Sequence, residues 1–312
     1  MLNVKIGVQA YFKCVAVDTT TRKETELTDW FPNLVLNAGL DRMSQGAWIN
    51  RVMVGSGNST PLITQTSLDN FVASTTTRTE HASTRQLTNL PYYYSLKTTF
   101  RFAQGAAAGN LSEIAMGWAD NSCWNRSLIK DSNGNPTTIT VKANEFLDIL
   151  TELRIYPNLN DVVSDVDLKN EDGDTISTHT VTVRPNMFID LIHSGSYELF
   201  ATAVRLADGI NNMTNTIRVR AGDALLNSIS QNVTGTTIVD THGSAGNNSY
   251  PSLKSCVYKL PFTITQALGL HKVISVKSRL GDWKFEYNPP ISKDNTQTLE
   301  HNFMLTWGRY EP

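Results

Sequence analysis

The chain opens with a strict alternation of apolar and polar residues. Every second position from residue 4 to residue 16 is apolar, and the positions between are mostly Lys, Gln, Gly and Tyr. A period of two places the two sets of side chains on opposite faces of a β-strand. One buried face and one polar face are typical of an antiparallel sheet rather than of a parallel sheet covered on both sides. The pattern therefore predicts a long antiparallel strand over residues 4–16.

Strand-like patterns return along most of the chain. They predict strands over residues 49–54, 94–102, 137–141, 146–156, 176–184, 256–264, 273–278, 283–287 and 299–310. A helical pattern is weak throughout, and we expect short helices only over 38–43, capped by Asn37, and within the less periodic residues 186–209. The fold class that follows is mainly β, with antiparallel β-sandwich-like domains, long loops and few short helices.

The length of 312 residues favours two domains, because single hydrophobic cores rarely grow so large. Residues 157–174 combine turn residues with a fall in hydrophobicity. We therefore expect an N-terminal β domain over 1–157, a linker over 158–174 and a C-terminal β domain over 175–312. Residues 56–91 are polar and rich in Thr, which predicts an extended arm or a long surface loop, and 227–252 reads as a second exposed loop.

Composition and charge narrow the possible partners. The net charge is −2, and no run of Lys or Arg suggests nucleic-acid binding or an anionic membrane surface. No segment is long and apolar enough for a spanning helix, and the first residues lack the apolar core of a signal peptide. The three cysteines have neither metal-ligand nor CxxC spacing, so we expect buried, reduced thiols. These features predict synthesis in a cytoplasm without membrane insertion.

Candidate catalytic and metal-binding residues are sparse. The six histidines lack HExxH spacing, and no nucleophile elbow of the GxSxG type is present. The acidic segment 165–174 could offer oxygen ligands to calcium, although it fails the EF-hand pattern and is also typical of a solvated hairpin. Strand alternation accounts for the carboxylates that might cleave a glycoside, namely Glu113, Glu145, Asp148 and Glu152. We expect no enzyme activity, no cofactor and no catalytic residue.

Two groups of aromatic residues could contact a receptor or another protein. One follows Pro91 in a loop, and the other occupies alternate positions of a strand near the C-terminus. They are Tyr92, Tyr93 and Tyr94, and Trp283, Phe285 and Tyr287. Such side chains can stack on sugars, but packing in a core or an interface is their more common fate.

Three stretches in the first half resemble structural proteins of the tailed-bacteriophage virion, from the tail tip, the baseplate or a tail fibre. They are DWFPNLVLNAGLDRM, INRVMVGSGNSTP and GNLSEIAMGWADNSCWNRSLIKDSNGNPTTITVKANEFLDILTELRIYP. The resemblance covers residues 28–157, and these are packing motifs rather than catalytic signatures. It implies a place in the virion tail after synthesis in the bacterial cytoplasm, and no functional residue is carried over from it.

The resulting functional hypothesis is a non-enzymatic tail component that acts through oligomerisation and protein–protein contacts. The symmetry of tails implies a threefold or sixfold homo-oligomer, with other tail proteins as further partners. Three alternatives stay open. The first is a receptor-binding module that recognises host polysaccharide or a pilus through loop 227–252 or the aromatic strand. The others are a depolymerase acting on envelope glycans and a capsid decoration protein.

Overall fold

The computed structural model describes residues 2–187, 214–220, 225–231, 233–244, 249–278 and 280–312. It contains 58% strand and 2% helix, which confirms the mainly β class. The first strand, β1 (Leu2–Asp18), carries the alternation that the sequence predicts: its apolar positions are buried, whereas most of the positions between them are partly or fully exposed. Most of the loops that connect consecutive strands are short, as expected for antiparallel sheets linked by hairpins.

The chain divides into two compact units, each of which includes one end of the chain. Of the described residues, the N unit contains 7–156 and 308–312. The C unit contains 2–6, 157–187 and the described residues between 214 and 307. The expected linker over 158–174 is wrong, because β15 (Val162–Lys169) lies there and pairs with β16 (Thr175–Pro185) as a hairpin. The exposed side chains of β15 explain why its sequence reads as a linker.

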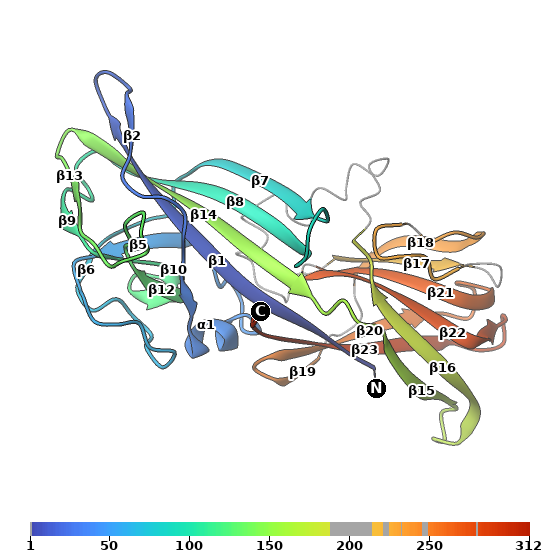
Figure 1. Ribbon diagram of the computed structural model, residues 1–312. Helices are drawn as coiled ribbons and strands as arrows, with labels where there is room; N and C mark the ends of the chain where they lie inside the picture. The colour runs from blue at the N-terminus through green and yellow to red at the C-terminus, as the bar shows by residue number, and fades with distance from the viewer. Residues whose placement is uncertain (1, 188–213, 221–224, 232, 245–248, 279) are drawn as a thin grey trace. The chain divides into compact units, whose positions relative to one another are not determined.

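Two sheets form most of the N unit (Figure 1). The first has the order β1, β14, β8 and β7, with β2 and β3 added to β1. Its further strands are β2 (Glu24–Glu26), β3 (Phe31–Pro32), β7 (Arg78–Gln86), β8 (Tyr93–Phe102) and β14 (Glu145–Pro157). The second has the order β4, β12, β10, β5 and β6, with β11 added to β10. Its strands are β4 (Leu34–Val35), β5 (Arg51–Gly55), β6 (Phe71–Thr75), β10 (Glu113–Ala119), β11 (Ser122–Cys123) and β12 (Asn125–Leu128). A separate pair joins β9 (Gly109–Leu111) to β13 (Ile139–Val141).

The expected polar arm over residues 56–91 is wrong. Strands β6 and β7 occupy its second part, and its first part is anchored to two fully buried charged residues, Glu113 and Arg126. The Glu113 carboxylate accepts hydrogen bonds from the backbone amides of Gly57 and Asn70, and Arg126 donates to the carbonyl oxygen of Ser59. A polar segment is thus packed on the unit through hydrogen bonds, which hydrophobic periodicity does not reveal.

The short helix α1 (Asn37–Arg42) lies close to the predicted position, but Asn37 is not its cap. The residue at the cap position is Leu36, and it makes no side-chain capping hydrogen bond. The Asn37 side chain instead accepts a hydrogen bond of 2.6 Å from the guanidinium of Arg309. The residue therefore ties the last residues of the chain to the N unit rather than starting the helix.

The C unit also contains two sheets. In one, β19, β20 and β23 are neighbours in that order within the nine-stranded sheet that also contains β1, and the other has the order β15, β16, β22, β21, β17 and β18. Their remaining strands are β17 (Thr214–Arg220), β18 (Thr237–Ser244), β19 (Ser249–Ser252), β20 (Ser255–Phe262), β21 (Gly269–Ser278), β22 (Gly281–Lys293) and β23 (Leu299–Arg309). Phe303 of β23 lies 5.0 Å from Phe285 and stacks on Tyr258 at 4.9 Å between ring centroids, in an aromatic core typical of a sandwich.

Two further expectations concern this unit. Segment 227–252 is not one continuous loop, because β18 and β19 lie within it. The short helix expected within residues 186–209 falls almost entirely outside the described residues.

Candidate functional site

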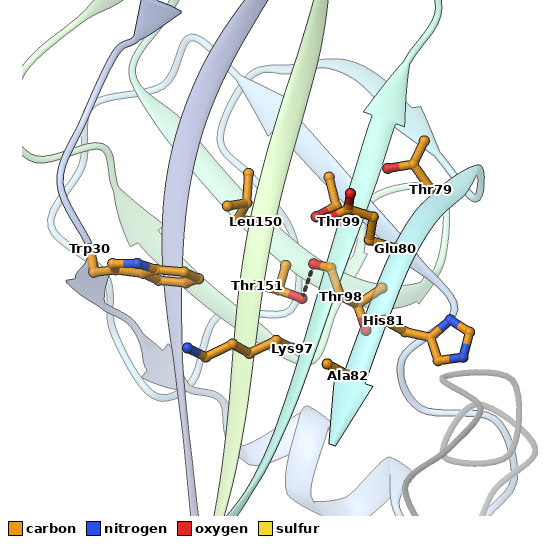
Figure 2. A pocket seen from close by; sticks show the side chains of 10 residues that line it. All are labelled: Trp30, Thr79, Glu80, His81, Ala82, Lys97, Thr98, Thr99, Leu150 and Thr151. Carbon is orange, nitrogen blue, oxygen red and sulfur yellow. Dashed lines mark hydrogen bonds between the residues drawn. The ribbon is translucent and has the colours of Figure 1, made fainter. Parts of the chain in front are cut away.

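A surface groove of about 540 Å³ crosses the outer face of the first sheet of the N unit (Figure 2). Strands β7, β8 and β14 form its floor, and Trp30, immediately before β3, stands at one side. The residues that line it are Trp30, Thr79, Glu80, His81, Ala82, Lys97, Thr98, Thr99, Leu150 and Thr151. Its volume lies within the roughly 300–1,000 Å³ of pockets that hold small organic ligands.

Strand register explains which side chains face the groove. Thr99 of β8 lies directly opposite Leu150 of β14 and Glu80 of β7, so these three side chains share one face of the sheet. Lys97, two residues before Thr99, shares that face as well. Thr98 and Thr151 are opposite each other in the neighbouring register position, and the Thr151 hydroxyl donates to the carbonyl oxygen of Thr98 at 3.0 Å. The hydrogen bonds between β8 and β14 therefore fix the relative positions of the side chains on the groove floor.

Trp30 faces the groove because its neighbour faces the core. Phe31 is paired with Phe12 of β1 and is buried, so the preceding residue must point to the other side of the sheet. The Trp30 side chain is 39% exposed, and the Lys97 Nζ atom lies 5.8 Å from its ring centroid. Figure 2 shows the two side chains extending toward one another. The groove thus combines an aromatic surface with an ammonium group at one side and, at the other, the carboxylate of Glu80.

The aromatic residues that the sequence suggests as contacts are separated by the structure. Trp283, Phe285 and Tyr287 are buried in the C unit, and Tyr94 is buried in the N unit. The expectation that these four contact a receptor is therefore wrong, because their surfaces are covered by the chain itself. Both sides of this part of β22 are covered, so alternation gives no exposed aromatic face.

Tyr92 and Tyr93 are partly exposed and are the two members of that set that remain accessible. Tyr93 packs on Tyr156 at 5.3 Å between ring centroids, and the guanidinium of Arg154 lies 4.4 Å from the Tyr93 ring. Tyr310 stacks on Tyr156 at 3.6 Å, so Tyr93 belongs to a cluster that also holds the chain end. This arrangement gives Tyr93 a packing role.

The carboxylates considered for glycoside cleavage each have a structural partner. Glu113 and Asp148 form ion pairs with Arg126 and Arg101, and Glu145 pairs with Lys142. Glu152 is buried; burial opposes its ionisation, but hydrogen bonds from Arg154 and Ser95 lower its pKa. Each of these carboxylates is therefore already engaged by a neighbouring basic side chain.

The acidic hairpin and the cysteines have equally structural surroundings. Asp165 and Asp167 of β15 accept hydrogen bonds of 2.8 and 2.7 Å from the hydroxyls of Thr180 and Thr178 on β16. Within the described ranges, no group of three or more His, Cys, Asp or Glu side chains is placed to hold a metal ion. The three thiols, Cys14, Cys123 and Cys256, are free and buried, and burial raises the pKa of Cys256 to about 11. No helix in the part of the chain that is described has the length and apolar character needed to cross a membrane.

Comparison with known proteins assigns no family to the chain. No protein-family model, no curated protein and no solved structure matches it.

The groove residues were not identified from the sequence. Lys97 and Thr99 lie in a predicted strand and read as its ordinary polar face, whereas Glu80 and His81 lie in the segment interpreted as an arm. One local signal was present, since Trp30 and Phe31 are adjacent and only one of them can face the core of a strand. A Trp on the outward side of a sheet is the feature that would have indicated this surface.

Proposed function

We propose that this chain is a non-enzymatic structural component of a bacteriophage tail, at the tail tip, the baseplate or a fibre-attachment site. It acts by assembling with copies of itself and with other tail proteins. The observation that carries the proposal is an apolar turn, residues 264–270, which joins β20 to β21 and includes the first two residues of β21. There, Ile264, Leu268 and Leu270 expose 49%, 45% and 49% of their surfaces.

An exposed apolar turn favours self-association. Three large aliphatic side chains within seven residues are costly to leave in water, and exposed apolar patches often mark protein–protein contacts. The turn is closed by a hydrogen bond of 3.1 Å from the Gln266 amide to the Thr263 carbonyl oxygen, and Gly269 adopts a positive φ of 125°. In a symmetric oligomer, one type of contact repeated between the copies can bury this turn in every copy.

The ion pairs of the candidate carboxylates further support a non-enzymatic role. The carboxylates that might act as acids or bases are paired with Arg or Lys, as described above. The resemblance of residues 28–157 to phage tail proteins supports a location in the virion tail. The symmetry of phage tails in turn supports a threefold or sixfold oligomer.

Light scattering after gel filtration of the full chain tests the self-assembly. The expected mass is that of three or six copies. Replacing Leu268 and Leu270 together by Ser is expected to shift the protein to smaller species without lowering its melting temperature. Leu62→Ser is the matched control, because Leu62 is also exposed but lies in the N unit loop. A wild-type protein that stays monomeric at all concentrations would contradict the self-assembly.

Immunogold labelling of virions tests whether the protein is located in the tail. Gold particles at the tail are expected. Labelling confined to the head would favour a capsid decoration protein instead, and virions without label would overturn the virion assignment.

A further inference from the structure

We propose that the groove beside Trp30 binds a neutral glycan built of hexose or N-acetylhexosamine rings. This binding function goes beyond assembly and uses a different surface from the apolar turn, since the groove belongs to the N unit and the turn to the C unit.

The aromatic side of the groove suits the apolar face of a sugar ring. A pyranose presents axial C–H groups on one face and hydroxyls around its rim. The Trp30 indole offers a large flat apolar surface and is 39% exposed, whereas an unused Trp is normally buried more completely. The Leu150 and Ala82 side chains add apolar floor, against which an acetamido methyl group can pack.

The polar groups match the rim of the ring. The Glu80 carboxylate accepts hydrogen bonds, the Lys97 ammonium donates them, and the Thr99 hydroxyl does both. Hydrogen bonds between an ionised side chain and a hydroxyl are stronger than those between neutral groups. Glycan hydroxyls, which also donate and accept, can use all three residues at once.

The charge balance selects a neutral ligand. Lys97 and Glu80 contribute one positive and one negative charge to the groove, and the side chain of Lys97 already lies over the Trp30 ring. An acidic sugar would be attracted by Lys97 but repelled by Glu80. A basic ligand would be attracted by Glu80 but repelled by Lys97. A neutral polyol suffers neither penalty.

The floor is also preorganised. Leu150, Thr99 and Glu80 lie on three neighbouring hydrogen-bonded strands, which together span roughly 10 Å. Because these positions are set by strand register, little conformational entropy is lost when a ligand binds. Because the lining residues come from three neighbouring strands and from Trp30, the groove suits an oligosaccharide rather than one enclosed sugar.

Calorimetric titration of the full-length protein with cellohexaose and chitohexaose tests the proposal, with an oligogalacturonate of similar length as the acidic comparison. We expect binding of at least one neutral oligosaccharide and weaker or no binding of the acidic one. Trp30→Ala is expected to weaken binding at least tenfold, Trp30→Phe to retain part of it, and Glu80→Gln to weaken it several-fold. Leu62→Ala, outside the groove, is the surface control and should bind normally.

Melting temperatures separate a binding defect from unfolding, because Trp30 and Glu80 are both exposed and their replacement should leave stability nearly unchanged. The proposal is overturned if the wild-type protein binds neither neutral oligosaccharide, if it binds only the acidic one, or if Trp30→Ala binds as well as wild type. These results do not depend on the oligomeric state, so failure here is distinguishable from failure of the assembly proposal.

Discussion

The Nε2 atom of His301 lies 3.1 Å from the Nδ1 atom of His271, and both imidazole rings are buried in the C unit. The other nitrogen of His271, Nε2, lies 2.6 Å from the carbonyl oxygen of Ala267 and must therefore carry a proton and donate it. His271 Nδ1 is then the acceptor, and His301 Nε2 is the donor. The hydrogen bonds thus select one tautomer of each neutral ring.

The surroundings of this pair disfavour a positive charge. Burial, together with smaller contributions from the neighbouring His271 and His179, lowers the pKa of His301 to about 3. Burial also lowers the pKa of His271, against the hydrogen bond to Ala267 and with a contribution from Lys293. Tyr287 packs against His301 at 5.2 Å between ring centroids, and no carboxylate of the described residues is among the causes of either pKa shift. Protonation of the pair must therefore disrupt its packing.

The first prediction is a loss of stability in mild acid. Because the pKa of His301 is lower in the folded than in the unfolded chain, its contribution is complete above the unfolded value of 6.5 and declines as the pH falls toward 3. Between about pH 7.5 and pH 5 this group alone should cost roughly 2 kcal/mol of the free energy of unfolding. Urea denaturation at the two pH values measures it.

His301→Gln should remove most of this pH dependence, whereas His81→Gln, at an exposed position, should preserve it. An unchanged pH dependence in His301→Gln would contradict the assignment. Since His271 binds the carbonyl of Ala267 in the apolar turn, acid should also loosen the turn that we propose for self-assembly.

The second prediction concerns the buried ion pair between Glu113 and Arg126. The Nη2 atom of Arg126 lies 2.8 Å from Glu113 Oε2, and neither side chain is exposed. Among the described residues, Glu113→Gln would leave the buried Arg126 charge with Asp69 as its one acidic partner, and it should lower the free energy of unfolding by about 3–5 kcal/mol. Hydrogen exchange should become faster at the amides of Gly57 and Asn70, which bind the carboxylate.

Asp69→Asn is the matched control for this pair, because the Asp69 side chain is 31% exposed and its loss can be compensated by water. It should cost much less than Glu113→Gln. Equal effects of the two substitutions would show that the buried carboxylate does not organise the loop.

The third prediction tests how the end of the chain is held. A Cβ atom at Gly7 would lie 2.9 Å from the Cα atom of Tyr310, and the Tyr310 amide donates a 3.0 Å hydrogen bond to Val8. Gly7→Ala must displace this backbone and should cost about 1–3 kcal/mol, with faster hydrogen exchange at Tyr310. Gly308→Ala is the control, since a Cβ atom there meets nothing within 4 Å, and its melting temperature should stay close to that of wild type. A larger effect at Gly308 than at Gly7 would refute this account.

The fourth prediction concerns Lys284, a fully buried residue of β22. Its Nζ atom donates to the carbonyl oxygens of Asn227, Ser228 and Gln231 at 2.9, 2.7 and 3.0 Å. Burial lowers its pKa to about 8, which leaves the ammonium form predominant at neutral pH. Lys284→Met would leave these carbonyl groups without their hydrogen-bond donor and should lower the free energy of unfolding by about 3 kcal/mol. Urea denaturation measures the cost, with the exposed Lys169→Met as control; equal stability of Lys284→Met and wild type would be incompatible with this role.

Local periodicity was sufficient for the strands whose two faces have different surroundings. The alternation around Phe12 predicts β1 because one side of that strand is buried and the other is largely polar. The helix near Leu40 was also anticipated, although its cap was misassigned: Asn37 binds Arg309, more than 270 residues away, and no local pattern encodes such a contact.

The aromatic strand shows where periodicity fails. Trp283, Lys284 and Phe285 are all buried, so apolar alternation in β22 marks neither an exposed face nor a receptor surface. A Lys whose charge is satisfied by carbonyl groups 53–57 residues away reads in the sequence as an exposed polar residue.

Side-chain polarity at neighbouring positions is enough to predict the mainly β class, the longest strands and the burial of the cysteines. It does not predict that residues 56–91 form strands and an anchored loop, that Glu113 pairs with Arg126, or that Trp30 lies beside Lys97 at a groove. These relationships join residues far apart in the chain, and their energies come from desolvation and hydrogen-bond geometry, which depend on three-dimensional contacts rather than on local order.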